Sequence, residues 1–191
     1  MMQLQQATVD EFRTHLRGDV LLPDAEGYDD SRQVWNAMID RRPALIARCA
    51  SAEDVVESVK FARAHNLLVA IRGGGHNIAG NAVCDDGIMI DLSRMKKMEF
   101  DEQSGVVTLE PGVGFYDLYD YLQQHNLPFW LSTPGNSWGS VIGNALDRGV
   151  GYTPYGENTK NFCGMEVVLP TGEVVRTGMG AFSKAPTWGL Y

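Results

Sequence analysis

The segment RRPALIARCASAEDVVESVKFARAHNLLVAIRGGGHN, residues 41–77, holds two short apolar runs, a helical pattern between them and a closing run of glycines. The runs RRPALIARC and LLVAIR are typical of short buried strands. Between them, Ser51 suits a helix N-cap and Asn66 can end the helix that follows. Strand, helix and strand in this order favour a right-handed crossover and a parallel pair. The second strand then leads directly into the glycines.

Three consecutive glycines, Gly73, Gly74 and Gly75, stand directly before His76. Glycine is costly to order, so three together indicate that the backbone must come close to another group. Successive N–H groups in such a turn can point into one concavity and bind an anion, and a diphosphate is the natural occupant. RGGGHNIAG lacks the G-x-G-x-x-G order and the G-K-[ST] of the common phosphate loops, which disfavours nicotinamide-Rossmann and NTPase folds. Taken alone, a histidine in such a turn is more often an ordinary solvated loop residue.

The rest of the chain predicts further short elements. Thr8 and Glu11 have capping-box spacing, which predicts a short helix ending near Gly18, and a lead-in loop follows at 21–28. Beyond the glycines, the patterns predict a strand at 87–92, a hairpin at 96–112, a helix at 114–126, a strand at 127–131, a glycine-rich loop at 132–156 and a hairpin at 165–178. The outline is an α+β fold of two lobes, each with a glycine-rich loop after a strand.

Composition limits the partners and the compartment. The 191 residues carry a formal charge of −8, with 16 Lys and Arg against 24 Asp and Glu, which argues against a nucleic-acid surface and for a small-molecule partner. The three cysteines, Cys49, Cys84 and Cys163, form no C-x-x-C pair, so neither a disulfide framework nor a metal site is expected. Cys84 and Cys163 suit small buried positions. No apolar run approaches the roughly 18 residues that span a bilayer, and we expect a cytoplasmic protein without membrane contact.

Two parts of the chain resemble a known superfamily. Residues 43–112, from PALIARC to TLEPG, resemble the start of the FAD domain of bacterial berberine-bridge-enzyme-like proteins and 6-hydroxynicotine oxidases. Residues 143–181, from GNALDRG to RTGMGA, are more similar to the vanillyl-alcohol oxidase and 4-cresol dehydrogenase branch. The resemblance implies the two-lobed FAD-binding domain of the p-cresol methylhydroxylase (PCMH) type. It divides the chain into a lead-in, residues 1–38, and this domain, residues 39–191, without the C-terminal substrate domain.

The resemblance also assigns roles around the first glycine-rich loop. His76 stands where the family joins a histidine covalently to the 8α carbon of FAD, the alternative being a noncovalent polar contact to the same cofactor. Gly73, Gly74, Gly75 and Asn77 would wrap the FAD diphosphate through their backbone amides. Arg72 could neutralise phosphate charge or merely cap the strand.

The second loop would approach the flavin ring and ribityl chain. Relatives with a second, cysteinyl link carry a cysteine just before this loop, and TPGNSW has none, so a single linkage is expected. For Tyr152, plain packing is an equal alternative. The residues implied in this loop are Pro134, Gly135, Ser137, Ser140, Gly143 and Asn144, with Gly151 and Tyr152 completing the wall.

The implied function is that of an FAD-dependent oxidoreductase. A small hydroxylated aromatic, N-heterocyclic or alcohol substrate would deliver hydride to flavin N5, and a partner domain or chain would cover the flavin. One alternative is a noncatalytic FAD-binding module or N-terminal fragment of such an oxidase, and another is a nucleotide-sugar reductase on a similar fold. The catalytic base, the substrate and the electron acceptor stay open.

Overall fold

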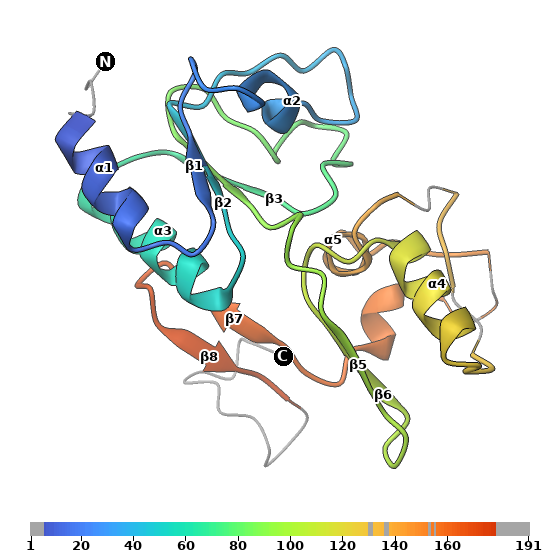
Figure 1. The fold of residues 1–191 in the computed structure, drawn as a ribbon. Coiled ribbons are helices and arrows are strands. Elements are labelled where there is room, and N and C mark those ends of the chain that lie inside the picture. The colour runs from blue at the N-terminus through green and yellow to red at the C-terminus, as the bar shows by residue number, and fades with distance from the viewer. Residues whose placement is uncertain (1–5, 130–131, 136–137, 153, 155, 179–191) are drawn as a thin grey trace.

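A four-stranded sheet forms the centre of the first lobe (Figure 1). The computed structural model describes residues 6–129, 132–135, 138–152, 154 and 156–178. The sheet has the order β1-β2-β4-β3, and its strands are β1 (Asp19–Leu21), β2 (Leu45–Arg48), β4 (Ile88–Asp91) and β3 (Val69–Arg72).

The two strands of the predicted crossover lie where expected but do not pair with each other. β4 lies between them, and both β2 and β3 run parallel to it, with Leu45 and Val69 each in register with Ile88. The helix between them, α3 (Ala52–Ala64), begins as predicted after Ser51, whose hydroxyl accepts a hydrogen bond from Asp54 N at 3.4 Å. Strand β1 pairs antiparallel with β2 at the other side of the sheet.

Alternating side chains of the sheet supply two cores. Leu45, Ala47, Ile88 and Ile90 face the helices α1 (Gln6–Thr14) and α3. Ile46 and Met89 face the other side, where they pack with Val83 and with Tyr28 of α2 (Tyr28–Arg32). Because both faces of β4 are covered, its residues are buried without alternation, as is usual for a central parallel strand.

Two predictions for the N-terminal part were wrong. Helix α1 begins before Thr8, so Thr8 does not cap it, and it ends at Thr14 rather than near Gly18. The loop expected at 21–28 is confirmed for residues 22–27, between the end of β1 at Leu21 and the start of α2 at Tyr28.

The second lobe is built on a hairpin and a helix. Strands β5 (Met98–Asp101) and β6 (Val106–Leu109) form the predicted antiparallel hairpin, and α4 (Phe115–Gln124) packs on it through Leu118 and Leu122. The predicted strand at 127–131 is not present at residues 127–129, and its last two residues lie outside the described part. Two short helices, α5 (Val141–Leu146) and the 3-10 helix η1 (Asn158–Asn161), follow.

A last hairpin lies against the first lobe. Strands β7 (Glu166–Val168) and β8 (Val174–Arg176) turn over Gly172, as predicted, and Gly172 lies against the side chain of Lys60 in α3. The two-lobed α+β expectation is thus confirmed. None of the helices built by the described residues is both long enough and apolar enough to cross a membrane.

Candidate functional site

The two glycine-rich loops meet where the lobes join. A Cβ atom on Gly74 would lie 2.6 Å from the backbone nitrogen of Ser140, and one on Gly73 would lie 3.2 Å from the Ser140 side chain. Ser140 in turn forms a β-bridge with Gly114 and donates a hydrogen bond to Pro111 O at 2.7 Å. The close approach of the second loop therefore requires glycine at position 74 and leaves little room for a side chain at position 73. The sequence could not identify Ser140 as their neighbour.

A cavity of about 370 Å³ lies beside this contact. Three of the predicted residues line it: Arg72, Gly73 and Gly74. The other lining residues were not predicted from the sequence, although two glycines in the stretch EPGVGFYDL, between a strand and a helix, were a usable signal. These other residues are Ser93, Lys96, Gly112, Gly114, Tyr116, Asp117 and Trp138.

Arg72 brings positive charge to the cavity from the end of β3. Its Nη1 lies 3.3 Å from Oδ2 of Asp91, which is 3% exposed. Its Nε is buried and has no hydrogen-bond partner among the described residues. Buried donors are nearly always satisfied in folded proteins, which makes this nitrogen unusual; it lies beside Gly75, where an added Cβ would be 3.2 Å from it.

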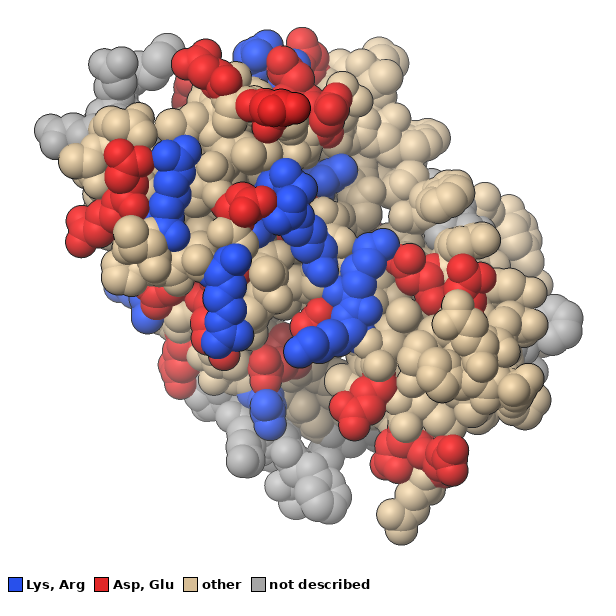
Figure 2. All heavy atoms as spheres, in the orientation of Figure 1, with Lys and Arg blue, Asp and Glu red and all other residues tan. Residues whose placement is uncertain are grey.

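Lys96 supplies the second cation, and it is paired with Asp117 at the start of α4. The distance from Lys96 Nζ to Asp117 Oδ2 is 2.8 Å, and Gly114 N donates to the same oxygen at 2.9 Å. Burial acts to raise the pKa of Asp117, but the hydrogen bonds from Lys96 and Gly114 outweigh it and lower the pKa. Figure 2 shows Lys and Arg side chains near the middle of the face that it draws, although the chain as a whole is acidic.

His76 lies at the far side of the glycine turn and is not among the residues that line the cavity. Its ring is half-buried beside the indole of Trp35, with 6.0 Å between the ring centroids. Burial lowers the pKa of His76 below its ordinary value of 6.5, and the positive charge of Arg72 lowers it further. The imidazole is therefore mostly neutral at pH 7, the form in which a ring nitrogen can act as a nucleophile.

The turn that carries His76 is shaped by Gly75, whose φ of 71° lies in the left-handed region. Asn77 then connects the first loop to the second, because its Nδ2 lies 3.4 Å from Oδ2 of Asp147 at the end of α5. The Oδ1 of Asn77 accepts a hydrogen bond from Asn81 N.

Parts of the second loop lie against one another. A Cβ atom on Gly135 would lie 3.1 Å from the hydroxyl of Tyr152, and one on Gly151 would lie 2.5 Å from the backbone carbon of Ser132. Tyr152 is 88% exposed, so it is not a packed core residue. Pro134, next to Gly135, is half-buried.

Helix α5, which was predicted to be loop, begins within this region. Ser140 is its N-cap and accepts a hydrogen bond from Gly143 N at 3.2 Å. Asn144 accepts a hydrogen bond at 2.7 Å from the side chain of Asn158 in η1. The predicted residue Ser137 lies outside the described part of the chain.

One expectation for the cysteines was wrong. Cys84 is buried as predicted, and burial raises the pKa of its thiol. Cys163 is exposed, because it lies in the connection between η1 and β7 rather than in a strand. Within the described ranges, no group of three or more His, Cys, Asp and Glu side chains is arranged to hold a metal ion.

Comparisons with known proteins agree with this geometry. The family described as FAD binding domain matches residues 43–178. The flavoprotein subunit of 4-cresol dehydrogenase [hydroxylating] from Pseudomonas putida is 34% identical over 190 residues, which cover 96% of this chain and 36% of that protein. (R)-6-hydroxynicotine oxidase from Paenarthrobacter nicotinovorans is 36% identical over 162 residues, which cover 84% of this chain and 35% of that protein.

Two solved structures of similar enzymes also match this chain. The structure of 6-hydroxy-D-nicotine oxidase from Arthrobacter nicotinovorans matches with a TM-score of 0.81 and 33% identity, over 85% of this chain and 36% of that one. The structure of p-cresol methylhydroxylase with substrate bound matches with a TM-score of 0.79 and 32% identity, over 98% of this chain and 39% of that one. The present chain thus spans little more than a third of the length of these relatives.

Proposed function

Because the chain belongs to the FAD binding domain family of FAD-linked oxidoreductases, we propose that it is the cofactor-holding part of such an enzyme. The substrate is a small hydroxylated aromatic, N-heterocyclic or alcohol compound. The names of two relatives support this class, since one acts on 4-cresol and the other on 6-hydroxynicotine. When bound, FAD supplies the acceptor for a hydride from the substrate at flavin N5.

The observation that carries the proposal is the contact between the two glycine-rich loops beside a cavity with two cations. FAD carries a diphosphate, and two cations at the cavity fit its charge. Arg72 brings a guanidinium group and Lys96 an ammonium group, which are paired with Asp91 and Asp117 respectively. Backbone amides of Gly73 and Gly74 complete an anion site of the kind that glycine turns form.

Proposed roles follow for the remaining residues of the two loops. Gly75 and Asn77 hold the turn around the diphosphate, and the second loop lies along the flavin ring and ribityl chain. The members of this second group are Pro134, Gly135, Ser137, Ser140, Gly143, Asn144, Gly151 and Tyr152.

His76 is proposed to bond covalently to FAD. In that bond a ring nitrogen of His76 would take the place of one hydrogen on the 8α carbon; the 8α C–H proton and the imidazole N–H proton would leave to solvent, and dioxygen would accept the two electrons released. The lowered pKa of His76 supports this role, since it keeps the nitrogen lone pair available near neutral pH. A cytoplasmic location and a further domain or chain that covers the flavin also remain proposals.

Acid precipitation tests the linkage. We expect yellow colour to stay with the pellet of the FAD-loaded protein and to pass into the supernatant for His76→Ala. His125→Ala, at an exposed histidine of α4's C-cap, is the matched control and should keep its colour in the pellet. Colour in the wild-type supernatant would leave only noncovalent binding.

A second assay tests turnover. We expect phenols or hydroxynicotines to bleach the bound flavin under anaerobic conditions. A flavin that no phenol, hydroxynicotine or sugar bleaches would instead indicate a module that carries FAD without turning substrate over.

A further inference from the structure

A short segment before the sheet, residues 34–39, lies along the loop that carries His76. Trp35 N donates a hydrogen bond to Gly75 O at 3.0 Å. Asn36 Nδ2 donates to Ile78 O at 2.9 Å. At the end of the segment, the side chain of Ile39 fills the space beside Gly80, where an added Cβ would lie 2.7 Å from Ile39 Cγ2. The segment therefore fixes the loop at three successive points.

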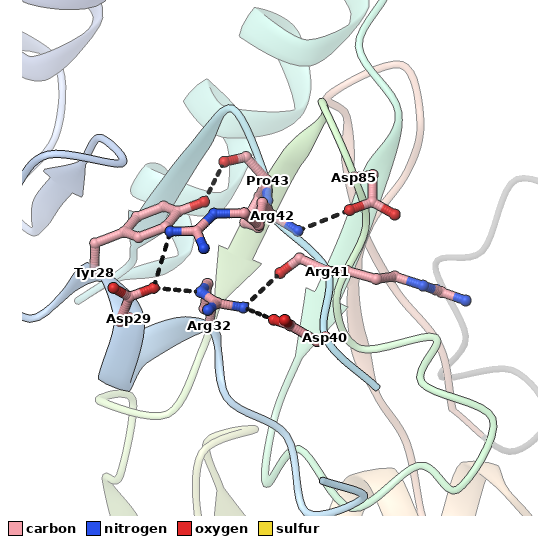
Figure 3. A network of polar contacts seen from close by, with 8 residues as sticks. All are labelled: Tyr28, Asp29, Arg32, Asp40, Arg41, Arg42, Pro43 and Asp85. Atoms are coloured by element: carbon pink, nitrogen blue, oxygen red, sulfur yellow. Dashed lines mark hydrogen bonds and ion pairs between the residues drawn. The ribbon is translucent and has the colours of Figure 1, made fainter. Parts of the chain in front are cut away.

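The segment is itself tied to the sheet by a polar network (Figure 3). Arg32 bonds to Asp29 and Asp40 and donates to Arg41 O. Tyr28 donates to Pro43 O at 2.6 Å at the entry to β2.

Arg41 leads from this network back to the loop. In Figure 3 its side chain points away from the other members of the network, and it donates to Gly80 O at 3.1 Å and to Val83 O at 3.0 Å. The position of residues 34–39 is thus determined from both ends, so the segment can act as a rigid support.

Trp35 is the residue of this segment whose side chain lies beside His76. Its indole and the His76 imidazole have centroids 6.0 Å apart with an interplanar angle of 32°. This spacing is within the range of attractive aromatic pairs. The indole is nevertheless 61% exposed, so little of its apolar surface contributes to a core. The backbone hydrogen bond of Trp35 keeps this exposed indole beside the imidazole. A role toward His76 therefore explains the position of the indole better than a role in core packing does.

We propose that Trp35 is a positioning residue for His76. This role rests on the covalent linkage between His76 and FAD proposed above. The indole restricts the rotamers of the imidazole and shields one side of it from water. His76 then meets the 8α carbon of bound FAD in a single orientation. The protons and electrons released in the covalent step go to solvent and dioxygen, as described under the proposed function. Trp35 takes no part in the bond itself.

The test compares Trp35→Phe, which keeps a ring, with Trp35→Leu, which removes it. Each variant is mixed with FAD, and the flavin retained by the acid pellet is followed over time at several pH values. For Trp35→Leu we expect linkage to slow by about tenfold, the effect of losing one aromatic contact, while the Kd for noncovalent FAD stays within about threefold. We expect Trp35→Phe to link within about threefold of the wild-type rate.

The pH profile separates positioning from a general loss of structure. Without the indole the imidazole is more hydrated, so the apparent pKa of the linkage rate should move up toward 6.5 in Trp35→Leu. Met38→Ala is the matched control, because Met38 lies in the same segment and is 91% exposed. It should keep the wild-type rate and profile.

Each negative result has a distinct meaning. Wild-type protein that releases all its flavin in acid contradicts the linkage, and with it this proposal. Wild-type protein that retains flavin, together with equal rates and equal pH profiles for Trp35→Phe and Trp35→Leu, overturns the role of Trp35 while the linkage stands.

Discussion

Gly74→Ala should weaken FAD binding, because it places a methyl group where the second loop must lie. The new Cβ would be 2.6 Å from Ser140 N and 3.2 Å from the backbone of Gly139. All of these neighbours are main-chain atoms, so no side-chain rotation can relieve the contact. Ser140 also caps α5 and bonds to Pro111 O, so its displacement disturbs both interactions. Overpacking of this kind costs about 1–3 kcal/mol.

We expect the variant to relieve this contact by a shift of the second loop, so that the cost appears in FAD binding, which by our proposal needs the two loops in contact. Converted at 1.4 kcal/mol for each factor of ten, it raises the Kd for FAD by about 5-fold to 150-fold. Quenching of flavin fluorescence in a titration measures the change.

The matched control is Gly105→Ala in the β5–β6 turn. Gly105 has a φ of 68° with open space around its Cβ position, so alanine there should lower the free energy of unfolding by about 1 kcal/mol and leave the Kd unchanged. Binding by Gly74→Ala within twofold of wild type would refute the idea that the loops must touch to hold the cofactor.

Three further outcomes follow from individual contacts. Asp54→Ala should lower the free energy of unfolding by about 3–5 kcal/mol in urea titrations, because the buried carboxylate accepts three backbone N–H bonds. Glu53→Gln, at an exposed side chain, should change the free energy of unfolding by less than about 0.5 kcal/mol. The linkage rate should rise with pH with a midpoint below pH 6.5, because burial and the charge of Arg72 hold the folded-state pKa of His76 below its ordinary value. The stability contributed by keeping His76 neutral should be lost as pH falls from 6.5 through that pKa. Lys96→Ala should raise the Kd for FAD by about tenfold in the same fluorescence titration and make binding less sensitive to salt, since the ammonium group is half-exposed at the cavity.

Local sequence signals predicted the elements that are stabilised locally. Ser51 begins α3 and the turn at Gly172 forms the last hairpin, because a cap and a left-handed glycine act within a few residues. The position of β4 between β2 and β3 could not be predicted in this way, since pairing depends on contacts between strands that are distant in the sequence. Helix α5 was missed because its six residues include Gly143, which favours a loop assignment.

For the candidate site as well, the sequence predicted the local features and missed the contacts between distant segments. The glycines of each loop were recognised, because consecutive residues without side chains are costly to order and mark a place where the backbone approaches another group. Gly112 and Gly114 were missed although the stretch EPGVGFYDL held a local signal. Their place at the cavity becomes clear only from the bridge between Gly114 and Ser140, which joins distant parts of the chain. The contact of Trp35 with His76 likewise joins two segments that no sequence pattern relates.

The three glycines before His76 prove to meet different requirements. Gly73 and Gly74 leave room for Ser140, whereas Gly75 adopts a left-handed φ that turns the chain toward Trp35. A ligand is therefore not needed to explain why each of them lacks a side chain. The case for a bound diphosphate depends instead on what surrounds them, namely the cations of Arg72 and Lys96 at the cavity. For this reason Lys96→Ala and Gly74→Ala test separate parts of the proposal, the first its charge and the second its shape.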